Sequence, residues 1–420
     1  MSGVDVLVVG AGAAGVAASL VLRRVGLKVV TLEAKDRIGG RCVTDRIGPG
    51  LPWDRGAHWL HDAERNPLRA YADRIGARYS RRPRKVLHHR HDGFAEPAWT
   101  AEVQAYAERA FRAVDDAGRR GEDRPASEVV PDHPRFKAMF WSLFAAFNGV
   151  EPDRMSTLDH ARSRDGANWP VMDGYGQLLA DLASGLPVCR STPVRRIDHR
   201  GRTLRIQVPN GTLDARAVLV TVSTTALLGG ALTFDPPLPP GHLEALDALP
   251  LGGANKVALV FTRNVFGRDD HHFLAFEHGT LEAARFDVRP AGRDLAIAYF
   301  GGRFAAEIEA AGERTMRSFA LEKLTSAYGS GVGRHLRDAM ATAWCGDPDI
   351  RGGYSCARPG CADARRTLSV PVGRIHFAGE AASIGAYGTV HGAWQSGERA
   401  AARIMQELGV EARMTPFDQD

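Results

Sequence analysis

The sequence predicts an α/β fold with a parallel sheet in its N-terminal part. Residues 4–9 are a run of apolar residues, which is typical of a strand buried on both faces. A glycine-containing turn follows, and residues 13–25 are rich in Ala and Leu, which predicts a helix. A second apolar run at residues 28–32 predicts the next strand. Strand, helix and strand in this order indicate a β-α-β unit.

The turn carries three glycines at G-x-G-x-x-G spacing, namely Gly10, Gly12 and Gly15. The first permits a tight turn, the second lets the backbone approach a pyrophosphate, and the third lets the helix press on the strand. The N-terminus of the helix offers free N–H groups and a positive dipole end to phosphates. Glu33, at the end of the second strand, can accept hydrogen bonds from a ribose. This context predicts a dinucleotide site, and the alternative is a glycine-rich turn in an ordinary β-α-β unit.

The composition is that of an ordinary globular enzyme, with 44% hydrophobic and 25% charged residues in 420. A net charge of +5 is small for this length and does not argue for nucleic acid. The five cysteines are scattered without the spacing of a zinc site, so we expect free thiols, no metal and a cytoplasmic location. No apolar stretch is long enough to span a membrane, and no signal peptide is expected.

Residues 64–145 are rich in Arg, Glu, Ala and aromatic residues at helical spacing, which predicts a helical insertion. Within it, residues 81–91 (RRPRKVLHHRH) are the most basic stretch of the chain. A solvated loop or an edge strand is the first interpretation of this stretch, and an anion-binding rim for a substrate or partner is the alternative. No aromatic residues interleave with its charges, so nucleic acid is not an expected partner.

The rest of the chain predicts a return to the first sheet, a second sheet and a final strand and helix. After a helix at residues 177–184, three short strands return to the first sheet, at residues 188–197, 203–208 and 217–222. Strands of a second sheet are predicted at residues 255–261, 295–300 and 339–344, with a helix at 307–328. A strand at residues 376–378 and a helix to about Leu408 close the chain.

The residues that follow the last strand indicate whether the predicted site binds NAD or FAD. The strand ends at Gly379 and Glu380, and a glycine-containing turn leads into the last helix. The positive N-terminus of a helix stabilises a group that becomes negative. Reduced flavin is anionic at its N1–C2=O edge, so this arrangement suits a flavin and favours FAD over NAD.

Six segments of the chain together resemble the flavin-containing amine oxidases, a family that includes monoamine, polyamine and L-amino-acid oxidases and histone-lysine demethylases. The resemblance runs nearly end to end and is far more specific for family and flavin than for substrate. The segments are VVGAGAAGVAAS, EAKDRIGGR, DRGAHWLH, GGANKVALVF, WCGDPDIRGGYS and HFAGEAASIGAYGTVHGAWQSGERAA.

The resemblance implies which residues hold FAD. The N-terminal segments would bind the ADP half, the TPVRRI segment the adenine, and the start of the last helix the ribityl chain and the pyrimidine edge. These residues are Gly10, Gly12, Ala13, Ala14, Gly15, Glu33, Ala34, Arg41, Val194, Gly379, Glu380, Thr389 and Val390. Arg41 also suits a bidentate grip on pyrophosphate, with a surface arginine as the alternative. Gly353 stands where monoamine oxidases have the cysteine that tethers FAD, so we expect non-covalent FAD.

The resemblance also implies five residues near the substrate. Lys256 matches the lysine that holds a water beneath flavin N5, and a solvated surface lysine is the alternative. Tyr354 matches the first of two aromatic residues that flank the amine. The second position is Thr389, as in polyamine oxidases, so the full aromatic cage of a monoamine oxidase is absent. Trp344 matches a tryptophan beside the flavin ring and His58 a histidine facing the tunnel, with a core tryptophan and a structural histidine as the alternatives.

The implied reaction is hydride transfer from the amine α-carbon to flavin N5, which gives an imine, followed by reoxidation of the flavin by O₂ to give hydrogen peroxide. Polyamines or other primary or secondary amines are the favoured substrates, although no run of acidic residues lines the predicted insertion. The alternative is an L-amino-acid oxidase, or a tailoring oxidase or desaturase acting on a non-amine. An amino-acid carboxylate would need an arginine, from residues 81–91 or from Arg303. A non-catalytic flavin-binding redox module is the alternative of another class.

We expect a Rossmann-type FAD-binding domain intertwined with an α+β substrate domain that has a mixed sheet and flanking helices. The active site is expected between the two domains, and a homodimer is a possible assembly. The predicted FAD-binding segments are 1–60, 186–235 and 370–410, the substrate segments are 61–185 and 236–369, and 411–420 is a C-terminal tail.

Overall fold

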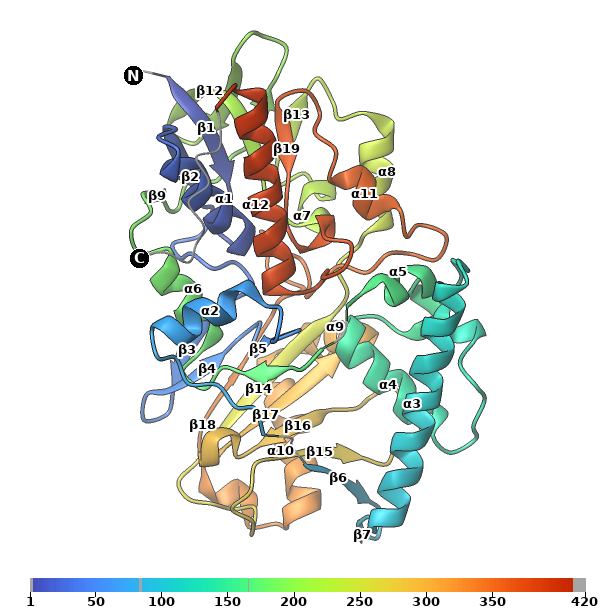
Figure 1. Ribbon diagram of the computed structural model, residues 1–420. Coiled ribbons are helices and arrows are strands. Elements are labelled where there is room, and N and C mark those ends of the chain that lie inside the picture. The colour runs from blue at the N-terminus through green and yellow to red at the C-terminus, as the bar shows by residue number, and fades with distance from the viewer. Residues whose placement is uncertain (1–2, 83–84, 165, 411–420) are drawn as a thin grey trace.

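The computed structural model describes residues 3–82, 85–164 and 166–410. The chain forms two lobes (Figure 1). The blue N-terminal and red C-terminal parts of the chain lie together in the upper lobe, and the yellow and orange segments build the sheet of the lower lobe. The predicted tail at residues 411–420 lies outside the described residues, and so do two residues of the basic stretch, 83 and 84.

The upper lobe contains an eight-stranded sheet with parallel strands at its centre. β1 (Val4–Val9) lies between β2 (Val29–Leu32) and β12 (Gly211–Val220), and β19 (Ile375–Phe377) pairs with β12; all three pairings are parallel. The edges are completed by β9 (Val188–Cys189), β10 (Arg196–Asp198), β11 (Leu204–Val208) and β13 (Thr233–Asp235). Segments far apart in the sequence therefore share one sheet.

Two helices from opposite ends of the chain pack on this sheet. α1 (Ala13–Arg24) and α12 (Val390–Glu407) share a hydrophobic cluster with Val6 and Val8 of β1. The two helices approach so closely that a Cβ at Gly397 of α12 would lie 2.1 Å from the carbonyl oxygen of Ala14. The first and last helices thus cover the same face of the sheet (Figure 1).

The lower lobe contains a seven-stranded mixed sheet. In this sheet β15 and β6 pair in parallel, and all the other neighbouring strands pair antiparallel. In sheet order its strands are β18 (Leu336–Ala341), β14 (Ala254–Phe261), β17 (Leu295–Gly301), β16 (Arg285–Val288), β15 (His272–Phe276), β6 (Lys85–Arg90) and β7 (Gly93–Phe94). The mixed sheet and flanking helices agree with the predicted fold class.

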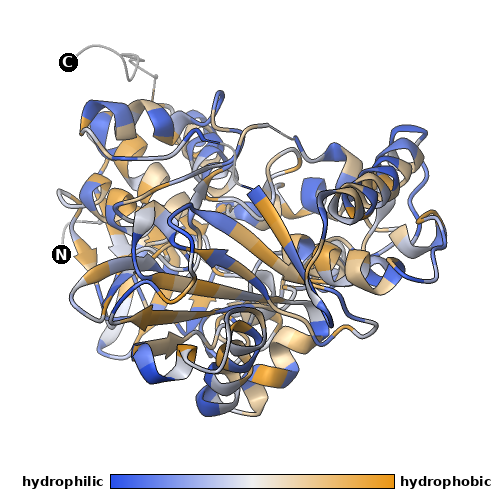
Figure 2. Ribbon diagram, turned by 90° about the horizontal axis from the view of Figure 1, so that it is seen from below, coloured by the Kyte–Doolittle hydropathy of each residue, from blue (hydrophilic) through white to orange (hydrophobic). Residues whose placement is uncertain are grey.

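The two faces of this sheet have different partners, because successive side chains of a strand point to opposite faces. Val257, Phe286 and Ala298 pack against α9 (Gly302–Ala310) and α10 (Glu313–Tyr328). Lys256 and Tyr299 lie on the opposite face. Figure 2 shows hydrophobic residues along the strands and hydrophilic residues on the outer helices.

The predicted helical insertion contains helices but also part of the second sheet. The structure places β6 and β7 inside it, so residues 64–145 are not wholly helical. Residues 85–90 of the basic stretch form β6. This strand lies next to the two-residue β7, which is the edge strand of the sheet. The helices of this region and the connector after it are α2 (Pro67–Arg74), α3 (Pro97–Arg119), α4 (Lys137–Asn148), α5 (Thr157–Arg162) and α6 (Tyr175–Leu182).

Short elements connect these parts. The strands among them are β3 (Thr44–Ile47), β4 (Leu51–Asp54), β5 (Trp59–Leu60) and β8 (Trp169–Pro170), and the helices are α7 (Thr224–Leu228), α8 (Pro240–Ala248) and α11 (Ala364–Leu368). The 3₁₀ turns are η1 (Ala126–Glu128), η2 (Pro152–Arg154), η3 (Pro290–Gly292), η4 (Val332–His335) and η5 (Glu380–Ala382). None of the helices in the described ranges has the length and hydropathy needed to cross a bilayer.

Three sequence predictions of elements are wrong in detail. Residues 188–197 form two strands at opposite ends of the sheet, β9 and β10, because Pro193 interrupts the run between them. The helix predicted at 307–328 is two helices, which separate at Gly312, where φ is +95°. The strand predicted at 339–344 is β18, which begins and ends three residues earlier.

Candidate active site

The glycine turn after β1 has the geometry that a dinucleotide site requires. Gly10 has φ +103°, which favours glycine, and a Cβ at Gly15 would lie 1.9 Å from the carbonyl oxygen of Gly10. A Cβ at Gly12 would meet no described atom within 4 Å, so this glycine is not required by packing within the chain. No side chain caps α1, whose first-turn amides at Ala13 and Ala14 have no intrahelical acceptor. This cradle fits a pyrophosphate group.

Glu33 lies at the end of β2, beside the segment that contains Val194. Its carboxylate accepts hydrogen bonds from the backbone N–H of Ala11 at 2.7 Å and of Lys35 at 3.0 Å. The backbone carbonyl of Glu33 accepts a hydrogen bond from Thr192 N–H at 2.8 Å, which brings the loop before β10 next to β2. Glu33, its neighbour Ala34 and Val194 are therefore gathered at one edge of the glycine turn, although the side chain of Val194 packs in the core.

Glu380 joins the two ends of the chain. Its carboxylate accepts from Nη1 of Arg41 at 2.9 Å, from Ser355 Oγ at 2.7 Å and from the N–H of Gly388 at 2.8 Å. Burial alone would raise the pKa of Glu380, but Arg41 and Arg365 hold it below its ordinary value. Glu380 is therefore an ionised carboxylate that fixes both the Arg41 loop and the turn before α12.

The N-terminus of α12 is capped by Thr389. The hydroxyl of Thr389 accepts from the N–H of Gly392 at 3.0 Å and donates to the carbonyl of Ala386 at 2.6 Å. This cap leaves the first-turn amides of Val390 and His391 without an intrahelical acceptor. Gly379, with φ +143°, makes the turn that separates β19 from this region. These amides and the buried carboxylate of Glu380 fit the polar groups of a flavin.

Lys256 is buried on the second sheet and reaches the loop that follows β4. Its Nζ donates to the carbonyl of Asp54 at 3.1 Å and to the carbonyl of Gly56, and lies 5.2 Å from the ring centre of Tyr299. Burial lowers the pKa of Lys256 from its ordinary value of 10.5 to about 8. The alternative of a solvated surface lysine is excluded, because only 8% of the residue is exposed.

His58 is held by a buried carboxylate that sequence reasoning did not select. Nδ1 of His58 lies 2.9 Å from a carboxylate oxygen of Asp54, which also accepts from Thr44 Oγ1 and from the N–H of Tyr175. Burial alone would raise the pKa of Asp54, but the hydrogen bonds from His58 and Thr44 hold it below its ordinary value. Nε2 of His58 is buried without a hydrogen-bond partner among the described residues. Asp54 thus orients the imidazole ring of His58 and leaves Nε2 available for a further hydrogen bond.

Tyr354 and Trp344 come from the segment between the second sheet and α11. The hydroxyl of Tyr354 donates to the carbonyl of Ala146 in α4 at 2.7 Å, and its side chain lies against Gly388, next to Thr389. Nε1 of Trp344 donates to the carbonyl of Arg55 at 3.1 Å, in the same loop as Gly56, whose carbonyl accepts from Lys256. The catalytic residues predicted from sequence therefore belong to neighbouring loops and strands, and their roles stay predictions.

A buried ion pair also supports this region, and its two residues were not identified from the sequence. Arg365 of α11 and Asp159 of α5 are fully buried and form a two-bond pair, at 2.7 Å each. Arg365 also donates to Ser355 Oγ at 2.8 Å, and this serine donates to Glu380. Because its partners lie up to 206 residues away, no local sequence pattern indicates the role of this arginine.

The fold and the site define a dinucleotide-binding protein with a second domain packed against the nucleotide domain. A family model described as flavin containing amine oxidoreductase matches residues 13–115 and 113–405. The chain belongs to this family, and it is an FAD-dependent oxidoreductase acting on amines.

Known relatives cover nearly the whole chain. It is 28% identical over 454 residues to polyamine oxidase 4 of Oryza sativa subsp. japonica, covering 97% of this chain and 90% of the relative. It is 26% identical over 438 residues to lysine-specific histone demethylase 2 of Homo sapiens, covering 95% of this chain and 53% of the relative. The fold is similar to that of cyclohexylamine oxidase from Brevibacterium oxydans IH-35A, with TM-score 0.79, 22% identity and coverage of 97% and 100%. A redesigned putrescine oxidase gives TM-score 0.81 at 20% identity, with coverage of 96% and 99%.

Proposed function

We propose that this chain is an amine oxidase that holds FAD without a covalent bond, uses O₂ as electron acceptor and releases hydrogen peroxide. The proposed substrates are polyamines or other primary or secondary amines, because polyamine oxidases are among the relatives and a putrescine oxidase shares the fold. The observation that carries the proposal is Lys256, a buried amine with a lowered pKa between the second sheet and the loop that contains Gly56. The cytoplasmic location stays a prediction.

Several residues would hold the cofactor, and bound FAD would supply the two-electron oxidation of the amine. Gly12 and the first-turn amides of α1 would contact the pyrophosphate, Glu33 the ribose and the segment of Val194 the adenine. Glu380 would contact the ribityl chain. Position 353 is a glycine, which offers no side chain for a covalent tether, and this supports non-covalent binding.

The chain's own residues would position the substrate and protons. With a pKa of about 8, Lys256 can hold a proton or release one near neutral pH, and its remaining N–H can orient a water molecule. Tyr354 and Trp344 would present aromatic surface to the amine, and the free Nε2 of His58 would accept from or donate to it. Because a neutral amine is the reactive form, activity should rise with pH through the pKa of the substrate amine.

The proposal is tested by mixing the purified holoenzyme without oxygen with spermine, spermidine, putrescine, benzylamine and amino acids. We expect at least one amine to bleach the flavin absorbance, and admission of air to restore it with release of peroxide. If none of these compounds bleaches the flavin, that result would contradict amine oxidation. Slow reoxidation in air after reduction by dithionite, together with no turnover, would instead favour a non-catalytic redox module.

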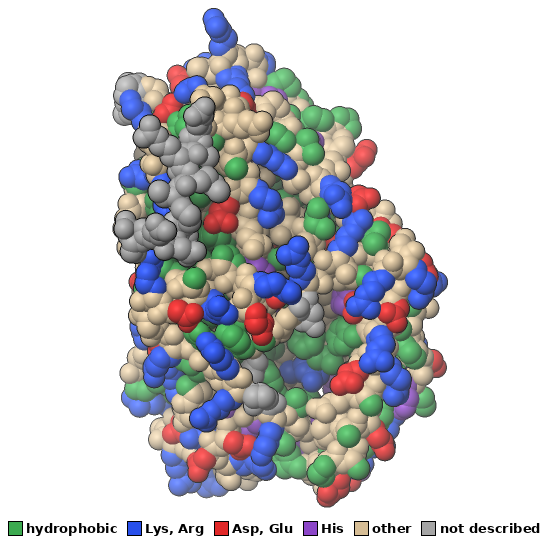
Figure 3. Space-filling model, viewed as in Figure 1, with side chains coloured by type: hydrophobic (Ala, Val, Ile, Leu, Met, Phe, Trp, Pro, Cys, Tyr) green, Lys and Arg blue, Asp and Glu red, His purple; other side chains and the backbone are tan. Residues whose placement is uncertain are grey.

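Amines that also carry a carboxylate are a second candidate substrate class, and Arg285 favours it. Tyr299 of β17 pairs with Lys256 on one side and with Arg285 on the other, so all three side chains share one face of the sheet. Within the described residues, the guanidinium of Arg285 has no hydrogen bond or ion pair, and burial lowers its pKa to about 10. Figure 3 shows a hollow in the lower lobe, lined by hydrophobic side chains, with basic side chains inside it.

The position of Arg285 also indicates what it would exclude. A second ammonium group of a polyamine would be repelled by an unpaired guanidinium, whereas a carboxylate would form a charge-assisted pair. Arg303, the arginine considered from the sequence, is half exposed and pairs with Glu151 at 3.5 Å, so it is the matched control. Arg285→Gln should raise KM for a carboxylated amine at least about tenfold and leave benzylamine unchanged, and Arg303→Gln should change neither. An equal effect of Arg285→Gln on both substrates would exclude a carboxylate anchor.

A further inference from the structure

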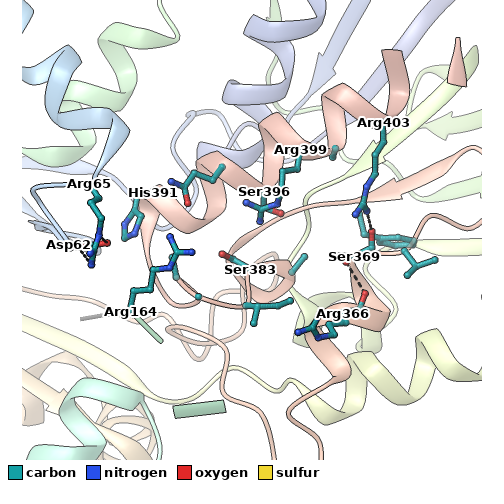
Figure 4. A pocket seen from close by; sticks show the side chains of 18 residues that line it. Asp62, Arg65, Arg164, Arg366, Ser369, Ser383, His391, Ser396, Arg399 and Arg403 are labelled. Carbon is teal, nitrogen blue, oxygen red and sulfur yellow. Dashed lines mark hydrogen bonds and ion pairs between the residues drawn. The ribbon is translucent and has the colours of Figure 1, made fainter. Parts of the chain in front are cut away.

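A pocket of about 510 Å³ lies on the face of α12 that is turned away from α1. Its walls come from α12, α11, the turn after β19 and two loops of the other lobe (Figure 4). The pocket is built on the same helix as the candidate flavin site, but its lining contains none of the glycines of the first turn, nor Lys256 or Tyr354. A pocket of this volume is large enough for a small organic ligand.

The lining is strongly basic. The lining residues include five arginines but only one carboxylate, that of Asp62. This carboxylate already forms an ion pair with Arg65 at 2.8 Å. Two further carboxylates lie close by: Asp363 lies 3.6 Å from Arg366, and Glu398 adjoins Arg399 in the chain. The five arginines are Arg65, Arg164, Arg366, Arg399 and Arg403.

Two of these arginines have no partner among the residues that the structure describes. The guanidinium groups of Arg164 and Arg399 form no hydrogen bond or ion pair there, whereas Arg403 donates to the carbonyl of Ser369. Partial burial of its guanidinium and the repulsion of Arg403 lower the pKa of Arg399, although the residue as a whole is exposed. Like charges held close together cost free energy, and a bound anion would offset this cost.

A buried polar atom at one end of the pocket provides an independent indication. His391 is only 5% exposed, and its Nδ1 has no hydrogen-bond partner within the described ranges. In Figure 4, His391, Arg164 and Asp62 lie at one end of the pocket and Arg403, Ser369 and Arg366 at the other. A buried nitrogen without a partner is costly, and a ligand oxygen or hydroxyl would satisfy it.

Part of the lining is apolar, and we call this part the floor; it lies beside Ser383 and Ser396, which Figure 4 shows between the two ends. Phe377, Ala382 and Ala400 line the pocket and are each about 5% exposed. A ligand with an organic body could therefore pack on the floor while its charged groups reach the arginines at either end.

We propose that this pocket binds a small organic polyanion, whose phosphate or carboxylate oxygens pair with Arg164, Arg399 and Arg403. Guanidinium groups form two parallel hydrogen bonds with either oxyanion, so the shared chemistry is that of a multivalent oxyanion. The site lies outside the reaction centre, and its existence does not depend on which amine is oxidised.

Calorimetric titration of the FAD-loaded enzyme tests the proposal with three probes at constant ionic strength: pyrophosphate, ADP and citrate. FAD occupies the dinucleotide site in this preparation, so the probes have no access to it. We expect saturable binding of at least one probe with one site per chain. Pyrophosphate or ADP alone would identify a phosphate ligand, citrate alone a carboxylate ligand, and preference for ADP would show use of the apolar floor.

Two variants decide where the probe binds. The double variant Arg164→Gln/Arg399→Gln should weaken binding at least about tenfold. Gln395→Glu, which adds a carboxylate to the pocket wall, should weaken it without removing an arginine. The matched control is Arg314→Gln/Arg337→Gln, which removes two exposed arginines outside the pocket. Absence of binding by all three probes, or equal affinity in the pocket variants and the control, would overturn the proposal.

Discussion

Replacement of Lys256 by methionine should change how stability depends on pH. The drop of the lysine pKa from 10.5 to about 8 on folding corresponds to about 3 kcal/mol. Below pH 8 the lysine is protonated in both the folded and the unfolded chain, and the buried charge lowers the free energy of unfolding. Between about pH 8 and 10.5 the unfolded chain binds the extra proton, so the free energy of unfolding rises with pH. Lys256→Met has no such proton and should lack this rise.

Denaturant unfolding of the wild-type chain and Lys256→Met from about pH 7 to 10.5 measures the difference directly. Other titrating groups are common to both proteins, so the difference isolates Lys256. We expect the wild-type chain to gain about 3 kcal/mol relative to the variant across this window. Lys28→Met, which removes an exposed lysine, is the matched control. A difference that stays constant with pH would refute the argument that burial shifts this amine.

Three further substitutions test the cradle and its support. Gly12→Ala should change the stability of the FAD-free protein by no more than about 1 kcal/mol, because the new methyl group meets no described atom within 4 Å, yet it should lower FAD affinity in equilibrium titration; unchanged affinity would contradict the pyrophosphate assignment. Gly15→Ala should cost about 2 kcal/mol or more in urea unfolding, because its Cβ would lie 1.9 Å from the carbonyl oxygen of Gly10; wild-type stability would show that the turn can relax. Arg365→Met should cost about 3–5 kcal/mol by leaving Asp159 buried and unpaired, and adding Asp159→Leu should restore part of the loss; no recovery in the double variant would point to another cause.

The sequence alone predicts the parts of this molecule that depend on neighbouring residues. β1, the glycine turn and α1 follow from hydrophobic runs and glycine spacing within thirty-odd residues, and Lys256 follows from the segment that resembles the family. Asp54 lies only four residues before its partner His58, but that spacing alone does not single it out, because its other partners come from α6 and β3. Arg285 is not among the arginines that the sequence suggests, those of residues 81–91 and Arg303, because its place beside Tyr299 depends on the register of three strands.

The breaks in predicted elements have the same explanation. Residues 188–197 contain enough β-branched residues to suggest one strand, but a strand is defined by its partners. Val188 pairs with Thr31 at one edge of the sheet, and Ile197 pairs with strands at the opposite edge. Hydrophobic pattern indicates that residues are buried, whereas the choice of partner depends on the whole chain.

The contact between Arg41 and Glu380 has a consequence for when the proposed FAD site can form. The loop of Arg41 leaves the ribosome well before Glu380, which lies 339 residues later in the chain, and well before β19 and α12 in the same C-terminal region. The proposed cradle therefore cannot close around FAD until these later residues have been made, so the earlier segments must stay in solution without the cofactor. A chain truncated before Ile375 should accordingly stay colourless when purified in excess FAD, and a yellow truncated product would show that the early segments suffice.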